Sequence, residues 1–201
     1  MSDACCTPPP PSSDPSYRRI LWIALFANLA MFGVELVASV WSGSSALAAD
    51  AADFLGDSAN YALSLGAIAL GGAWVSRVAL LKGAAMSVYG LAVLAYAAWR
   101  AWLGVPPEPV TMGVVGALAL AVNFSVAALL FRFREGDANM RSVWLCTRND
   151  VIANLAVLVA AAGVFGTGTV WPDVAVAAML ALLGLSSGRI VIRQARAELS
   201  A

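Results

Sequence analysis

Long apolar stretches alternate with short polar ones along most of the chain. Six of these stretches approach or exceed the roughly 20 residues that an α-helix needs to cross the hydrocarbon core of a bilayer. We therefore expect an all-α membrane protein with six transmembrane helices. The expected spans are about residues 19–41, 44–74, 79–103, 110–131, 142–165 and 171–192.

The pattern changes at both ends of this apolar region. Residues 1–17 are rich in proline and serine and lack the apolar centre of a signal peptide. We expect a disordered or polyproline tail there, in which Cys5 and Cys6 either capture metal or are incidental. A six-helix transmembrane domain over 18–193 and a short cytoplasmic tail over 194–201 complete the expected organisation.

Composition supports a membrane protein and excludes several other classes. Of 201 residues, 61% are hydrophobic and 12% are charged, and the mean hydropathy is +0.80, which lies outside the usual range of a soluble domain. The formal net charge is zero, and no basic block suggests a nucleic-acid partner. The three cysteines show no disulfide-like spacing.

The basic residues predict the orientation of the helices. They gather before the first stretch, around the second and fourth connections and after the sixth stretch, and these regions share one side of the membrane in a six-span topology. Lysine and arginine favour the cytoplasmic side, so we expect both termini to be cytoplasmic. Arg100 is the exception, but Trp99 and Trp102 flank it as in an interfacial aromatic belt. The sorted residues are Arg18, Arg19, Arg77, Lys82, Arg132, Arg134, Arg141, Arg189, Arg193 and Arg196.

The second stretch contains a polar stripe. Asp50, Asp53, Asp57 and Asn60 recur at intervals of three or four residues, which places them on one face of a helix. Ionisable groups inside a membrane are costly and usually functional. Three acids on one face indicate a site for a cation.

A second polar stripe lies in the fifth stretch, at Cys146, Asp150 and Asn154. At 1.5 Å per residue, counted from opposite membrane surfaces, Cys146 and Asp150 reach about the depth of Asp53 and Asp57 in a core about 30 Å thick. The second and fifth helices are the middle helices of two three-helix halves. Such an inverted arrangement is typical of transporters with a site at mid-membrane.

Asp53, Asp57, Cys146 and Asp150 could together supply the four ligands of a tetrahedral transition metal. A thiolate favours Zn²⁺, Cd²⁺ or Co²⁺ over Mg²⁺ and Ca²⁺, with Fe, Mn and Ni as further possibilities. Because these ligands must lose protons to bind, metal loading would release protons. The metal is the expected cargo, and we expect no prosthetic group.

Other polar positions keep two interpretations open. Asp50 could be a third acid of the pocket, or it could order the start of its helix through the backbone or Ser44. Glu35 could assist the ligands or relay protons, or it could form a hydrogen bond within the bundle. Asn154 is a possible secondary contact of the site. Asn60 and Asn123 are expected to hydrogen-bond between helices.

The order of these residues resembles the cation diffusion facilitator family. Glu35, Ser42-Gly43-Ser44, Ala49-Asp50-Ala51 and Asp53-x-x-x-Asp57 are similar to its first two spans. The run Cys146-x-x-x-Asp150-Val-Ile-Ala-Asn154 is similar to its His-x-x-x-Asp motif, with cysteine in place of histidine. The resemblance extends over about residues 18–196.

This resemblance implies a homodimeric exporter of divalent transition metals from the cytoplasm, driven by inward proton flow. Its transport site would be Asp53, Asp57, Cys146 and Asp150, and its location would be the inner membrane of a bacterium. Family members commonly carry a cytoplasmic ferredoxin-like domain after the sixth span. We expect a short form without it, whose dimer contacts lie in the membrane. The chain also contains no histidine.

Two other functions compete with transport. A non-transporting metal-binding partner or sensor subunit would fit a missing cytoplasmic domain, but the polar stripes on both helices argue for a working site. Membrane CDP-alcohol phosphotransferases also place aspartates across their helices, and Asp50-x-x-Asp53 resembles the start of their motif. Phe54 stands where those enzymes need glycine, and no Ala-Arg follows. We therefore expect a transporter and not an enzyme.

Overall fold

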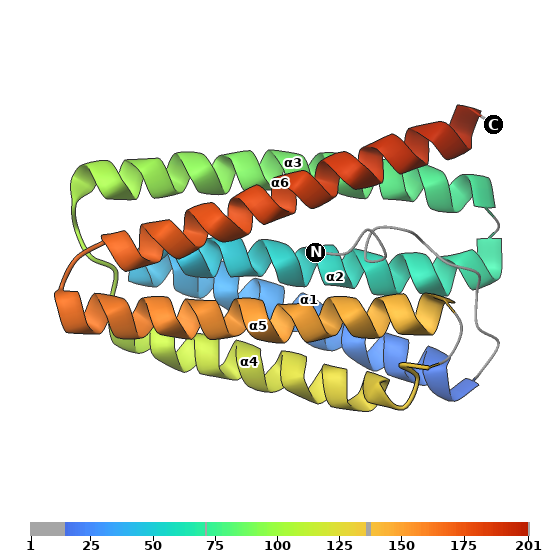
Figure 1. Cartoon of the computed structure of the whole chain (residues 1–201), viewed down its shortest axis with the longest axis horizontal. Helices are drawn as coiled ribbons and strands as arrows, with labels where there is room; N and C mark the ends of the chain where they lie inside the picture. Colours follow the sequence, from blue (N-terminus) through green and yellow to red (C-terminus); the bar gives the residue numbers. More distant parts are fainter. Residues whose placement is uncertain (1–14, 71, 136–137, 201) are drawn as a thin grey trace.

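The computed structural model of the chain describes residues 15–70, 72–135 and 138–200. These residues form six α-helices and no strand (Figure 1). The expected all-α class and the six-helix order are confirmed. The helices are α1 (Pro15–Ser42), α2 (Ser45–Leu70), α3 (Gly72–Leu103), α4 (Pro109–Phe131), α5 (Ala138–Thr167) and α6 (Trp171–Ser200).

The helix boundaries differ from the expected spans mainly at three places. α2 ends at Leu70 and α3 begins at Gly72, several residues before the connection expected near Arg77, in a glycine-containing segment of low helix propensity. α1 begins at Pro15 and α6 continues to Ser200, because a helix can extend beyond the apolar stretch that crosses a membrane. Cys5, Cys6 and residues 1–14 of the expected tail lie outside the described residues.

Five of the six helices are long and apolar enough to cross a membrane: α1, α3, α4, α5 and α6. Their large apolar side chains are widely exposed, for example Phe26, Phe124 and Val159, as expected for surfaces that face lipid. The exception is α2, which is 26 residues long but contains Asp50 and two further aspartates. The protein is therefore an integral, multi-pass membrane protein. Its most polar helix, α2, needs the neighbouring helices to shield its aspartates from lipid.

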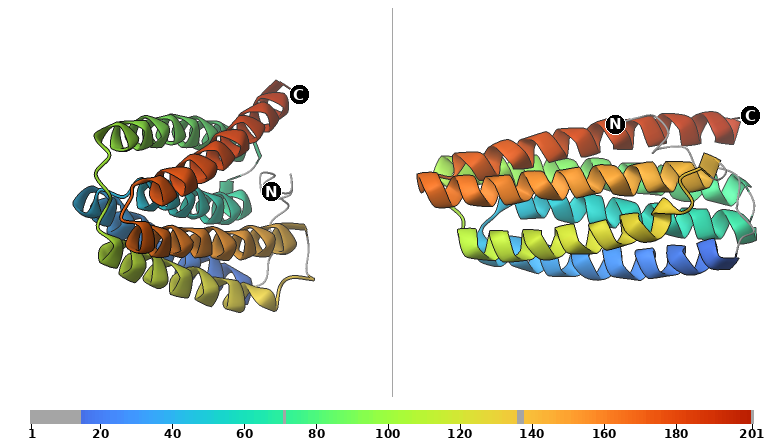
Figure 2. Two further views of the ribbon diagram at one scale, coloured as in Figure 1. Left: turned by 60° about the vertical axis from the view of Figure 1, so that its left-hand side comes forward. Right: turned by 60° about the horizontal axis from the view of Figure 1, so that its bottom comes forward.

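α2 lies at the centre of the bundle. The closest helix pairs are α3 with α6, α1 with α2, and α4 with α5, while α2 also contacts α3, α5 and α6. The views in Figure 2 show α2 between the α3–α6 pair and the α4–α5 pair. A core of mostly small side chains, including Leu47, Val157 and Ala177, fills the space between these helices. Polar side chains of α2 are consequently enclosed by protein.

One end of the bundle is held by tight turns after α1, α3 and α5. Gly43, Gly104 and Gly168 follow these helices with φ angles of 71°, 65° and 62°, which glycine adopts without steric cost. A Cβ atom at Gly43 would also lie 2.5 Å from the guanidinium of Arg100. This close approach explains how an arginine is accommodated at the end of the bundle that has few basic residues.

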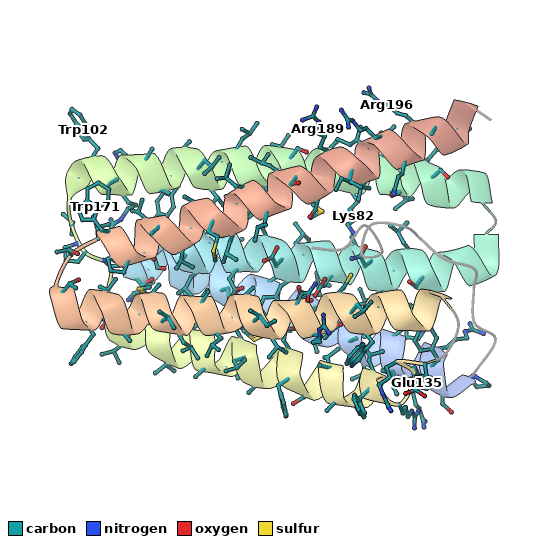
Figure 3. The ribbon with its side chains drawn as sticks, in the orientation of Figure 1. Lys82, Trp102, Glu135, Trp171, Arg189 and Arg196 are labelled. Atoms are coloured by element: carbon teal, nitrogen blue, oxygen red, sulfur yellow. The ribbon has the colours of Figure 1, made fainter. Side chains whose placement is uncertain are left out.

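Exposed tryptophans surround the same end. Trp41, Trp99, Trp102 and Trp171 are 85%, 56%, 88% and 63% exposed, and Trp102 and Trp171 lie together at this end in Figure 3. Tryptophan is enriched where a membrane meets water. The expected belt around Arg100 therefore extends over α1, α3 and α6.

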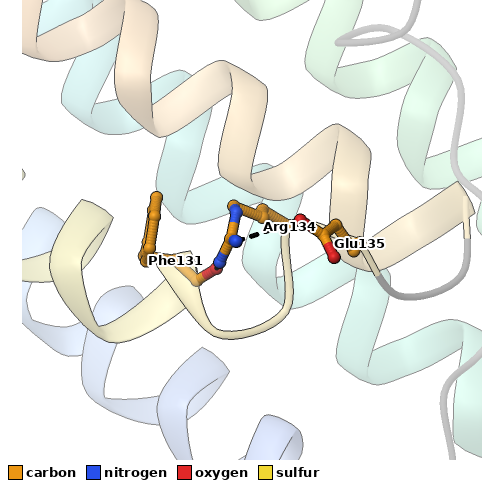
Figure 4. A network of polar contacts seen from close by, with 3 residues as sticks. All are labelled: Phe131, Arg134 and Glu135. Carbon is orange, nitrogen blue, oxygen red and sulfur yellow. Dashed lines mark hydrogen bonds and ion pairs between the residues drawn. The ribbon is translucent and has the colours of Figure 1, made fainter.

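The opposite end carries basic residues, as the turn after α4 illustrates (Figure 4). There Arg134 lies over the ring of Phe131 at 4.0 Å and donates a hydrogen bond of 3.2 Å to its carbonyl oxygen. Arg134 also forms an ion pair of 2.9 Å with Glu135. These contacts are local to the turn. They do not involve the polar groups inside the bundle.

Candidate metal site

A cavity of about 350 Å³ lies inside the bundle, between α2, α3, α5 and α6. All four predicted ligands line it: Asp53 and Asp57 from α2, and Cys146 and Asp150 from α5. The structure thus brings together two stripes that are about 90 residues apart in sequence. Their shared cavity is the arrangement that a cation site between these helices needs.

The two acid-bearing helices meet closely at this cavity. Asp57 is 7% exposed, and its carboxyl group lies within hydrogen-bonding reach of that of Asp150. One turn along α2, the hydroxyl groups of Tyr61 and Thr147 are 2.9 Å apart. This second contact between α2 and α5 fixes the relative height of the aspartates and Cys146.

The cavity is wider than a coordinated ion requires. Among the described residues, no group of three or more cysteine, aspartate or glutamate side chains is arranged to hold a metal ion. A metal bound by all four side chains would therefore require these side chains to rearrange. Asp53 and Asp150 are only partly buried, so their side chains have room for such a rearrangement.

Sulfur atoms contribute another part of the lining. Met86 of α3 and Met179 of α6 face the cavity together with Cys146. A Cβ atom at Gly56 would meet Met86 Cε at 3.3 Å and Sδ at 3.6 Å, so the glycine lets the thioether approach α2 between Asp53 and Asp57. Thioethers and thiolates bind soft metals best. Sequence reasoning missed these methionines because methionine is also a common filler of apolar cores.

Lys82 also lines the cavity, although the sequence analysis did not identify it as a candidate site residue. The charge pattern groups it with the second connection between helices, but it lies within α3, is 9% exposed and lines the cavity. Its ammonium group donates a hydrogen bond to the side-chain oxygen of Asn60. The sequence does contain a signal for an inward-facing lysine, because Lys82 is inside the expected span 79–103 and one turn from Met86.

A buried polar network lies beside the cavity. The side-chain nitrogen of Asn154 is 2.9 and 2.8 Å from the two carboxylate oxygens of Asp50, and Asn123 donates to Asn154 at 2.9 Å. Glu35 of α1 is fully buried, and its carboxyl group lies against that of Asp50. Asp50 and Asn154 are thus bonded to each other and are not among the residues that line the cavity.

The start of α2 is held by a different acid, Asp173 at the beginning of α6. Its carboxylate accepts hydrogen bonds from the hydroxyl groups of Ser44 at 2.6 Å and Ser45 at 2.5 Å. It also accepts bonds from the backbone amides of Ser45 at 2.8 Å and Ala46 at 3.0 Å. Asp173 therefore performs the helix-ordering role that was one interpretation of Asp50. A carboxylate at a helix N-terminus is stabilised by the helix dipole and free amides.

The bundle and its cavity define a class: polytopic membrane proteins with an acidic site enclosed by their helices. Residues 21–200 match the family model of the cation efflux transmembrane domain. The chain belongs to this family.

Relatives have been described in several bacteria. The metal cation efflux system protein CzcD of Cupriavidus metallidurans is 27% identical over 190 residues, which cover 88% of this chain and 60% of that protein. A cadmium, cobalt and zinc/H⁺-K⁺ antiporter of Bacillus velezensis is 25% identical over 189 residues, covering 86% of this chain and 60% of that protein. The chain spans about 60% of the length of these curated relatives.

Proposed function

We propose that this protein exports divalent transition-metal ions from the cytoplasm in exchange for protons. Asp53, Asp57, Cys146 and Asp150 form its transport site. The observation that supports this proposal most strongly is their convergence on one cavity from two helices. Membership of the cation efflux family supports the same function.

The donor atoms favour borderline and soft ions. Three carboxylates and one thiolate suit Zn²⁺, Cd²⁺ and Co²⁺, whereas Mg²⁺ and Ca²⁺ prefer shells of oxygen alone. The name of the Bacillus velezensis relative includes the same three metals. Met86 and Met179 add sulfur to the cavity wall and strengthen the preference for Cd²⁺.

Proton exchange follows from the contact between acids. The carboxyl groups of Asp57 and Asp150 lie within hydrogen-bonding reach of each other, and like charges this close disfavour ionisation of both groups, so in this proposal the pair holds a proton when no cation is present. A divalent ion that binds both carboxylates displaces this proton. Return of a proton from the other side of the membrane then favours release of the metal, which couples the two flows.

The direction of transport depends on orientation and assembly. The end of the bundle with most basic residues is the cytoplasmic end in this proposal, following the positive-inside rule. The functional unit is a homodimer whose contacts involve the membrane helices. Alternation of the site between the two sides then requires α2 and α5 to move relative to their neighbours.

Flux measurements in liposomes test the proposal. The purified full chain is reconstituted with an internal pH dye, and uptake of Zn²⁺, Cd²⁺, Co²⁺, Mn²⁺ and Fe²⁺ is recorded. We expect metal flux with opposite proton flux, and at least a tenfold loss in the Asp57→Asn and Asp150→Asn variants because each loses a charged ligand. Glu135→Gln is the matched control, since Glu135 is an exposed acid outside the cavity.

The outcomes separate the competing functions. Absence of flux with every metal would refute transport, and metal binding without flux would indicate a partner or sensor subunit. Cys146→Ser is expected to weaken Cd²⁺ binding more than Zn²⁺ binding, because oxygen is a harder donor than sulfur. If affinity and ion preference are both unchanged, Cys146 is not a ligand.

A further inference from the structure

Lys82 places a cation in a cavity proposed to bind cations. Its side chain reaches from α3 between α2 and α6 (Figure 3), and only 9% of the residue is exposed. Arg189 and Arg196 project outward from α6 in the same view and are exposed. Lys82 is therefore distinguished from these arginines by its direction and burial.

The surroundings of Lys82 are acidic. Its ammonium group donates to Asn60, which lies one turn beyond Asp57 on the same face of α2, and its charge acts on the Asp57 carboxylate. Asp53 and Asp150 line the same cavity. A buried lysine is costly unless opposite charges compensate it. These carboxylates supply that compensation.

We propose that Lys82 is a tethered counter-ion of the metal-free cavity, which an incoming divalent cation must displace. This inference rests on the proposed function, because it concerns the same site. In this structure the ammonium group is hydrogen-bonded to Asn60, and the flexible four-carbon stem of lysine allows it to move away from Asp57 when a metal binds there. The lysine thereby weakens metal affinity and assists release by returning to the carboxylates.

A tethered counter-ion also discriminates between ions by charge. A monovalent ion that replaces the ammonium group leaves the net charge of the cavity unchanged. A divalent ion makes that charge more positive by one unit and so compensates the carboxylates better. Na⁺ and K⁺ are therefore excluded by competition, although they are far more abundant. This selectivity does not require a close fit of ligands, and it agrees with a cavity wider than one coordinated ion.

The competing explanation is structural, in which the Lys82 to Asn60 hydrogen bond only ties α3 to α2. The two explanations predict opposite effects of removing the charge. Loss of a structural tie would leave metal affinity unchanged or weaken it by distorting α2. Loss of a competing cation would strengthen metal binding and admit monovalent ions.

The experiment measures Cd²⁺ and Zn²⁺ binding to the purified full chain by titration calorimetry, with and without added KCl. The variants are Lys82→Met, which keeps the length without the charge, Lys82→Arg, which keeps a cation, and Arg77→Met. Arg77 is the matched control because it lies on α3 and is exposed. We expect Lys82→Met to bind about tenfold more tightly and to lose affinity in KCl more steeply than the wild type. Arg77→Met should resemble the wild type, and Lys82→Arg, which keeps the charge, should not bind metal more tightly than the wild type.

Unchanged or weaker binding by a folded Lys82→Met variant would overturn the proposal, as would wild-type salt sensitivity. If that variant does not fold, Lys82→Gln replaces it with the same two expectations. Chemical rescue gives an independent check: butylamine should lower the metal affinity of Lys82→Ala toward the wild-type value, and no effect would contradict the counter-ion role. If the wild type and Arg77→Met bind no metal, the proposed function itself fails.

Discussion

Two buried aspartates in this protein are held by particular neighbours. Asp173 receives four hydrogen bonds from Ser44, Ser45 and Ala46, and Asp50 receives two from Asn154. Both are completely buried and have fixed positions. Asp53 and Asp57 instead face a cavity, where their carboxylate oxygens can rearrange around a cation. The same residue type therefore serves structure at Asp50 and Asp173, and in our proposal it binds the cation at Asp53 and Asp57.

At the residue scale, we predict that Asn154→Ala destabilises the protein by about 2–4 kcal/mol, because the buried Asp50 carboxylate loses two donors and Asn123 loses its acceptor. The measurement is equilibrium unfolding in detergent micelles with increasing SDS. Ser125→Ala is the control, since Ser125 is exposed and its hydroxyl bonds only to Ala121 of its own helix. Equal stability of the two variants would show that Asp50 finds other partners.

At the scale of the elements, α2 is the helix that depends most on others. Its aspartates make it too polar to count among the spans defined by apolarity alone. Contacts with α1, α3, α5 and α6 enclose it, and Asp173 of α6 satisfies amides at its first turn. An element that other helices must hold in place is suited to carry a site that changes its geometry during transport.

Removal of the Asp173 carboxylate tests this dependence. We expect Asp173→Ala to cost about 2–4 kcal/mol of stability, because two hydroxyl groups and two backbone amides lose a buried acceptor. Hydrogen exchange should rise selectively at residues 45–50. Glu108→Gln is the control, since Glu108 is exposed and its carboxylate accepts hydrogen bonds from Val110 and Thr111 of its own helix end at the start of α4. Uniform exchange across all helices would argue against a local role.

Glu108 caps the N-terminus of α4 and lies outside the membrane spans. Hydrogen bonds from the Thr111 side chain and backbone, then from the Val110 backbone, lower the pKa of its carboxyl group. The cap is accordingly complete above the ordinary pKa of glutamate and is lost as the pH falls through the lowered value. Its contribution is local to α4, whereas Asp173 joins two helices.

At the scale of the whole molecule, the polar interior is asymmetric along the bundle. The cavity is lined by Lys82 near the start of α3 and by Ser187 and Val191 in the second half of α6. These parts of the helices lie toward the end that carries the basic residues. On the other side of Asp53, the Asp50 and Asn154 network fills the interior. In the proposed orientation this end is cytoplasmic, and we therefore predict that ions enter the cavity from the cytoplasmic side.

Thiol labelling tests this asymmetry. With Cys5 and Cys6 replaced by serine, Cys146 is the remaining thiol, and it is partly exposed. We expect a charged, membrane-impermeant methanethiosulfonate to modify Cys146 faster from the cytoplasmic side of oriented vesicles, with protection by Cd²⁺. Faster reaction from the opposite side would contradict the inferred access, and lack of protection would separate Cys146 from the metal site.

Apolar length by itself determined much of this architecture. Six stretches of about 20 or more apolar residues allow little other than membrane helices, and periodicity within α2 and α5 places each polar stripe on one face. The residues Asp53, Asp57, Cys146 and Asp150 could be selected from the sequence because ionisable groups are rare in such helices. Their role as ligands remains a prediction for the flux and labelling experiments.

Only the tertiary structure decided which polar groups are partners. Sequence gives the face of a helix but not its rotation against neighbours, so it could not show that Asp173 holds the start of α2 or that Asn154 binds Asp50. It also could not show that Lys82 points inward, because a basic residue near the end of a span often reaches toward water. These pairings depend on contacts between distant helices, and such contacts form only when all six helices pack together.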